Sequence, residues 1–127
     1  MKQHSFSKEQ RLISNRQFKD VLASGRCLHD DLLMVYMIEN RCGYPRLGVS
    51  IGKSQGNAVT RNRLKRLIRE VFRQNQEQIP GDYDYLILIR QKTKQPTFEQ
   101  IKNSFLALVI PAKKSVKKIS YILIGML

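Results

Sequence analysis

The chain has 127 residues, of which 42% are hydrophobic, so we expect one folded domain with a single core. Lys and Arg number 23 and Asp and Glu number 10, which gives a formal net charge of +13. Such an excess indicates a polyanionic partner, with nucleic acid ahead of an anionic membrane surface. The sequence has no membrane-spanning apolar run or secretory signal, and its two cysteines, Cys27 and Cys42, form no metal or disulfide motif. We therefore expect a cytoplasmic protein with reduced thiols.

Hydrophobic periodicity predicts an α+β domain with the order αβββαβα and one sheet on which helices pack. Capping signals support the predicted helices: Ser14 with Gln17, Asn57, and Thr97 with Gln100. The predicted helices cover about 15–24, 58–75 and the segment from Thr97 to Pro111, and the predicted strands cover 26–29, 32–38, 46–52 and 83–90. Residues 53–57 are expected to form a loop.

The helix predicted over 58–75 carries a strongly one-sided charge. Its apolar residues fall on one side, whereas Arg61, Lys65, Arg69 and Arg73 follow one i,i+4 row of a single sign. A solvated surface usually mixes both signs, so this row favours a polyanion-binding side of the helix. The chain shows no clear helix-turn-helix, which favours RNA over DNA.

A second surface is expected on the predicted sheet. The strand at 46–52 places Arg46, Gly48, Ser50 and Gly52 on one side, a floor small enough for close approach of another backbone. Phe18 and Tyr36 could stack on bases of single-stranded RNA there, or they could be ordinary core residues.

Residues for independent catalysis are missing from the sequence. The two histidines, His4 and His29, form no metal-ligand pattern, and the close acid pairs Asp30–Asp31 and Asp82/Asp84 have the position of strand-boundary residues. We therefore expect a binding protein that holds no cofactor of its own.

The run RLGVSIGKSQGNAVTRNRLKRLIREVFR closely resembles the signature of the bacterial ribonuclease P protein subunit, and the likeness extends over about residues 6–110. The resemblance implies a compact α-β sandwich with one mixed sheet and a left-handed βαβ crossover around the basic helix, similar to the second domain of ribosomal protein S5. It also implies a complex with a catalytic RNA that holds the magnesium ions. That complex removes the leader of precursor tRNA at the mature 5′ end by endonucleolytic hydrolysis, without DNA or membrane partners.

The resemblance assigns two groups of residues. Those expected to bind the catalytic RNA are Arg61, Asn62, Arg63, Lys65, Arg66 and Arg69. Those expected in a cleft for the single-stranded leader are Phe18, Tyr36, Arg46, Ser50 and Lys53, while Leu22 stands where many members carry a second cleft Phe. We expect a ribonuclease P protein domain over 1–111, followed by a basic and apolar tail over 112–127 without an assigned role.

Overall fold

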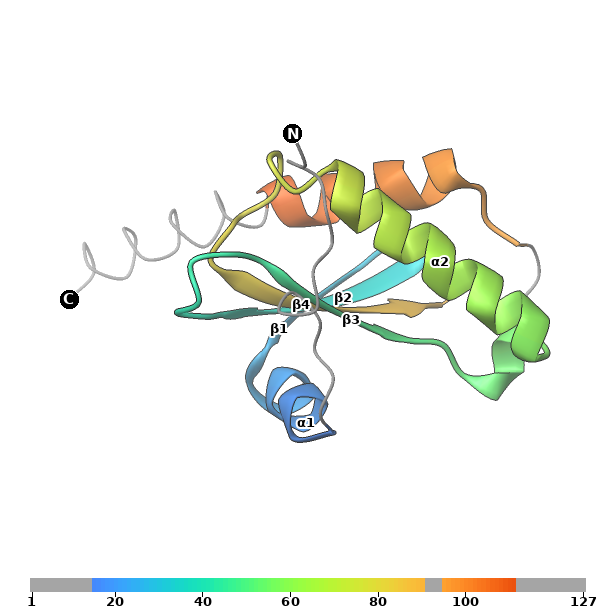
Figure 1. Cartoon of the computed structure of the whole chain (residues 1–127), viewed down its shortest axis with the longest axis horizontal. Helices are drawn as coiled ribbons and strands as arrows, with labels where there is room; N and C mark the ends of the chain where they lie inside the picture. The colour runs from blue at the N-terminus through green and yellow to red at the C-terminus, as the bar shows by residue number, and fades with distance from the viewer. Residues whose placement is uncertain (1–14, 91–94, 112–127) are drawn as a thin grey trace.

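A computed structural model describes residues 15–90 and 95–111. Four strands form one mixed sheet, with α1 on one face and α2 and a helix over 98–111 on the other (Figure 1). The elements are α1 (Asn15–Ser24), β1 (Arg26–His29), β2 (Leu33–Glu39), β3 (Arg46–Ser50), the short 3-10 helix η2 (Lys53–Gln55), α2 (Ala58–Gln74), β4 (Tyr83–Ile89) and the 98–111 helix.

The predicted α+β order and the single mixed sheet are confirmed, and most predicted boundaries lie within one or two residues of the observed ones. The loop expected over 53–57 instead contains η2, whose Gln55 donates a 3.2 Å hydrogen bond to the carbonyl of Ile89. The capping box proposed for Ser14 and Gln17 and the tail over 112–127 lie outside the described side chains.

The sheet has the strand order β1-β2-β4-β3. The pairings of β1 with β2 and of β2 with β4 are antiparallel, whereas β3 and β4 are parallel neighbours connected through α2. The long apolar run of β4 is explained by this central position, because a central strand is covered on both faces.

The main core lies between the sheet and the two helices on its upper face in Figure 1. Alternate residues of the strands point into this core, and α2 contributes Leu64, Ile68, Val71 and Phe72. A smaller cluster on the opposite face joins Val21 of α1 to Leu86 of β4. The central sheet is therefore packed on both sides.

Side-chain caps start the two later helices. Asn57 Oδ1 accepts a 3.0 Å hydrogen bond from the backbone N–H of Thr60, as predicted. The capping box of Thr97 and Gln100 is also confirmed, because each side chain accepts a hydrogen bond from the other residue's backbone N–H, at 3.2 and 2.9 Å.

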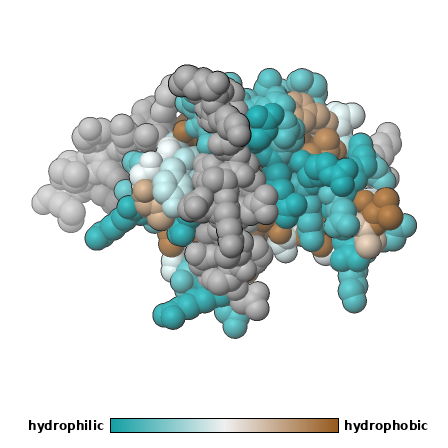
Figure 2. Space-filling model, viewed as in Figure 1, coloured by the Kyte–Doolittle hydropathy of each residue, from teal (hydrophilic) through white to brown (hydrophobic). Residues whose placement is uncertain are grey.

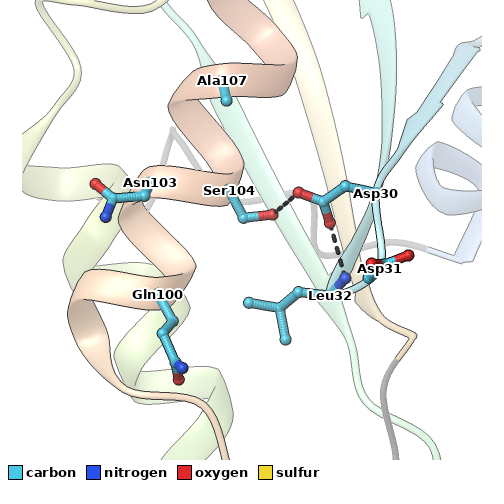
Figure 3. Close-up of a pocket in the computed structure, with 7 residues that line it drawn as sticks. All are labelled: Asp30, Asp31, Leu32, Gln100, Asn103, Ser104 and Ala107. Atoms are coloured by element: carbon cyan, nitrogen blue, oxygen red, sulfur yellow. Dashed lines mark hydrogen bonds between the residues drawn. The ribbon is translucent and has the colours of Figure 1, made fainter.

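The 98–111 helix is attached to the loop between β1 and β2 through Asp30 (Figure 3). The Asp30 carboxylate accepts hydrogen bonds from the Ser104 hydroxyl and from the backbone N–H groups of Leu32 and Leu33. Burial opposes ionisation of Asp30, but these hydrogen bonds and the charge of Arg90 together hold its pKa below the ordinary value. Asp30 therefore connects two elements, a role beyond that of a strand-boundary residue.

Candidate nucleic-acid interface

The basic side of α2 is turned away from the core. Because Leu64, Ile68 and Phe72 are fully buried against the sheet, the rotation of the helix about its axis is fixed. Figure 2 shows hydrophilic side chains over the part of the surface that α2 occupies. Of the six residues predicted to bind the catalytic RNA, the four that are exposed are Asn62, Arg63, Arg66 and Arg69. The other two, Arg61 and Lys65, are half-buried.

Basic side chains on α2 also contact other residues of the protein. Arg63 donates a 2.9 Å hydrogen bond from Nη1 to Oε1 of Gln95, just ahead of the 98–111 helix. Arg73 forms an ion pair with Glu70, and hydrogen bonds from Arg73 and Gln74 lower the pKa of Glu70 to about 2. Arg73 was predicted to continue a row of one sign, but Glu70 offsets its charge at this end of the row. Most of the positive charge of α2 therefore precedes Glu70 along the helix.

The opposite face of the sheet, here called the α1 face, contains the predicted leader residues of the strands. The strand register aligns its side chains in three rows across β2, β4 and β3. These rows are Ile38–Asp84–Arg46, then Tyr36–Leu86–Gly48, then Met34–Leu88–Ser50. Tyr36, Arg46 and Ser50 thus share one face but lie in three different rows.

Two other predicted leader residues flank this face. Phe18 belongs to α1, but its side chain lies outside the described part of the structure. Lys53 is exposed in η2, just past the Ser50 end of β3. The surface therefore continues from Ser50 to Lys53, and the chain then enters the basic helix α2.

Tyr36 lies beside Cys27 on the neighbouring edge strand, directly opposite it in the register. Burial, followed by a hydrogen bond with Cys27, raises the pKa of Tyr36 above its ordinary value. A neutral aromatic ring that is half-exposed can offer its face to a base.

Arg46 is held by a carboxylate that sequence reasoning placed at a strand boundary. Asp84 lies inside β4 and is buried, and its two oxygens accept hydrogen bonds from Nε and Nη2 of Arg46 at 2.7 and 2.6 Å. Asn40 donates a third hydrogen bond to Asp84, at 2.7 Å. The hydrogen bond with Asp84 raises the pKa of Arg46. The charge of Arg46 is consequently offset within the protein.

Asp84 and Asn40 are the residues of this surface that sequence reasoning missed. The sequence did contain one indication. Asp84 is the second residue of an otherwise apolar central strand, and a carboxylate at such a position requires a partner. Which residue is that partner depends on the pairing of β3 with β4, which local sequence patterns do not reveal.

Metal-binding clusters and membrane-spanning helices are both absent from the part of the chain that the structure describes. Over residues 15–90 and 95–111, no group of three or more His, Cys, Asp or Glu side chains is placed to hold a metal ion. No helix within the same ranges is long and apolar enough to span a membrane. Cys27 and Cys42 are both free and exposed.

Comparison with known proteins gives a consistent result. The family model described as Ribonuclease P matches residues 6–118. The "Ribonuclease P protein component" of Petrotoga mobilis is 36% identical over 113 residues, covering 86% of this chain and 96% of that protein. The protein of the same name from Clostridioides difficile is 35% identical over 105 residues, covering 82% and 92%.

Solved structures agree with the sequence comparison. The RNase P protein of Thermotoga maritima superimposes with a TM-score of 0.73 at 30% identity, covering 80% of this chain and 96% of that one. The RNase P protein of Staphylococcus aureus gives a TM-score of 0.70 at 34% identity, covering 78% and 91%. With its basic helix, sheet and matched length, this chain belongs to the ribonuclease P protein family.

Proposed function

We propose that this chain is the protein subunit of a bacterial ribonuclease P that binds two RNA elements through two surfaces. The exposed basic side of α2 binds the folded catalytic RNA. The α1 face binds the single-stranded 5′ leader of precursor tRNA. The RNA, with its own Mg²⁺, performs the endonucleolytic hydrolysis that gives the mature tRNA 5′ end, and the complex acts in the cytoplasm without DNA or membrane partners.

The observation that carries this proposal is the exposed excess of positive charge on the side of α2 that faces away from the core. Arg66 and Arg69 are exposed one turn apart, and the opposite side of the helix is buried. Guanidinium groups grip phosphate oxygens in pairs, and an A-form helix is recognised through its phosphates and shape. Arg61 and Lys65 are like charges at i,i+4, which destabilise an isolated helix, so a partner of opposite charge accounts for their retention.

The leader surface is supported by the chemistry of the α1 face. Tyr36 offers a half-exposed ring, Ser50 is a small exposed residue and Lys53 supplies a positive charge. Single-stranded RNA is bound by such a combination of stacking and electrostatic attraction. The two surfaces lie on opposite faces of the sheet and approach each other near η2 (Figure 1), an arrangement that supports a leader running beside the catalytic RNA.

Reconstitution tests the proposal. The purified protein alone is expected to leave precursor tRNA uncut, whereas protein plus cognate RNA at limiting Mg²⁺ is expected to release the leader faster than the RNA alone. The control is Arg26→Ala, because Arg26 is exposed on β1, the edge strand opposite β3. This variant should retain the stimulation. Cleavage by the protein alone would identify a protein nuclease. No stimulation at limiting Mg²⁺ would leave only general RNA binding.

A further inference from the structure

The helix α1 divides the α1 face into two regions. Figure 1 shows α1 close to end-on while the strands run across the view, so the helix crosses the strands of the sheet. Val21 packs against Leu86 of β4. In a helix of 3.6 residues per turn, Asp20 and Leu22 then lie about 100° to either side of Val21. The two flanks of α1 therefore face opposite ends of the sheet.

The Asp20 flank faces a hollow of about 390 Å³ at the Arg46 end of β3. Three carboxylates and two guanidinium groups line this hollow, among them Asp20, Arg41, Arg46 and Asp84. Because Asp84 holds Arg46 through two hydrogen bonds, the Arg46 charge is largely cancelled there. The remaining charges do not favour a phosphate group.

The other flank has the opposite character. Leu22 is 47% exposed on that flank. The row of the sheet nearest to this flank of α1 contains Ser50. The exposed Lys53 follows Ser50 along the chain, in η2. Gly48, which lies between Ser50 and Arg46 on β3, is buried. The surface of β3 is therefore closed at Gly48, and an RNA strand bound at Ser50 has no exposed path along β3 to Arg46.

We propose that the bound leader extends over the sheet only as far as α1. Its phosphates bind on the Ser50–Lys53 side of the helix and are repelled on the Asp20 side. This inference rests on the proposed function and refines it. Arg46 then serves as the partner that keeps Asp84 and the start of β3 in place, and it makes no phosphate contact. Asp20 determines how much of a leader the protein binds.

The inference predicts a change in dependence on leader length. For the reconstituted complex, affinity for precursor tRNA should rise with leader length and then level off when the strand reaches α1. Asp20→Lys places a positive charge at the hollow, so longer leaders should gain affinity by about two- to tenfold while the shortest leaders gain none. The salt dependence of the longest leaders should steepen by about 0.7 in slope.

Asp31→Lys is the matched control, because Asp31 is also exposed and its replacement changes the net charge by the same amount on the loop between β1 and β2. It should shift all leader lengths together. If Asp20→Lys also shifts all lengths together, or leaves the plateau where it is, the division of the face is wrong. If the unaltered complex shows no dependence on leader length at all, the proposed leader surface itself is wrong.

Discussion

Replacing Arg66 by Ala tests the basic side of α2 most directly. The side chain is exposed, and no carboxylate within residues 15–90 and 95–111 forms an ion pair with it, so its removal should leave the fold intact and subtract one phosphate contact. The five basic residues assigned to the RNA are Arg61, Arg63, Lys65, Arg66 and Arg69. If each neutralises one phosphate, log K falls with log salt at a slope of about −4.5, and of about −3.6 after the substitution.

These slopes translate into a measurable difference. Between about 50 and 200 mM salt, the unaltered protein should lose about 500-fold in affinity for the catalytic RNA, and Arg66→Ala about 150-fold. Filter binding or fluorescence anisotropy against the cognate RNA over this range measures both slopes. Arg26→Ala is the control, because β1 lies at the opposite edge of the sheet from β3, where α2 packs. Equal slopes for Arg66→Ala and the unaltered protein would refute the assignment of Arg66 to the RNA-binding side of α2.

The remaining predictions concern the leader surface and the fold. Leu22→Phe should add a stacking ring on α1 and tighten binding of precursor tRNA by about 1 kcal/mol relative to mature tRNA, and equal gains for both substrates would contradict this. Asp84→Asn should destabilise the protein by about 1–3 kcal/mol in urea unfolding, because the partly buried Arg46 loses its charged partner, and an unchanged midpoint would refute that role. Asp30 has a lowered pKa in the folded state, so its contribution is present above its unfolded pKa of about 3.9 and is lost as pH falls through the folded pKa. Ser104→Ala removes one of the hydrogen bonds that lower this pKa. The free energy of unfolding should therefore fall less below about pH 4, as measured by urea midpoints across pH.

Local sequence patterns were sufficient for the elements and for the orientation of α2. Asn57 and the Thr97–Gln100 box gave the helix starts, because capping depends on residues within one turn. The apolar spacing of Leu64, Ile68 and Phe72 gave the buried side, and hence the exposed basic side.

Interactions between distant segments were beyond the same reasoning. Arg46 and Asp84 are 38 positions apart and meet only because β3 pairs in parallel with β4. Asp30 and Ser104 are 74 positions apart and meet only after the 98–111 helix has docked. The expected floor of small residues on β3 was correctly placed on one face, but its division by α1 depends on how the helix crosses the sheet.

The burial of one side of α2 also links RNA binding to folding thermodynamics. The row of like charges opposes helix formation in an isolated segment, so α2 depends on its contacts with the sheet to stay helical. An RNA that binds only the helical form must therefore stabilise the whole domain, by about 2.7 kcal/mol when its free concentration is 100 times the dissociation constant. The melting temperature of the protein should accordingly report occupancy by RNA, and subunit that lacks its RNA partner should be the form most readily degraded in the cell.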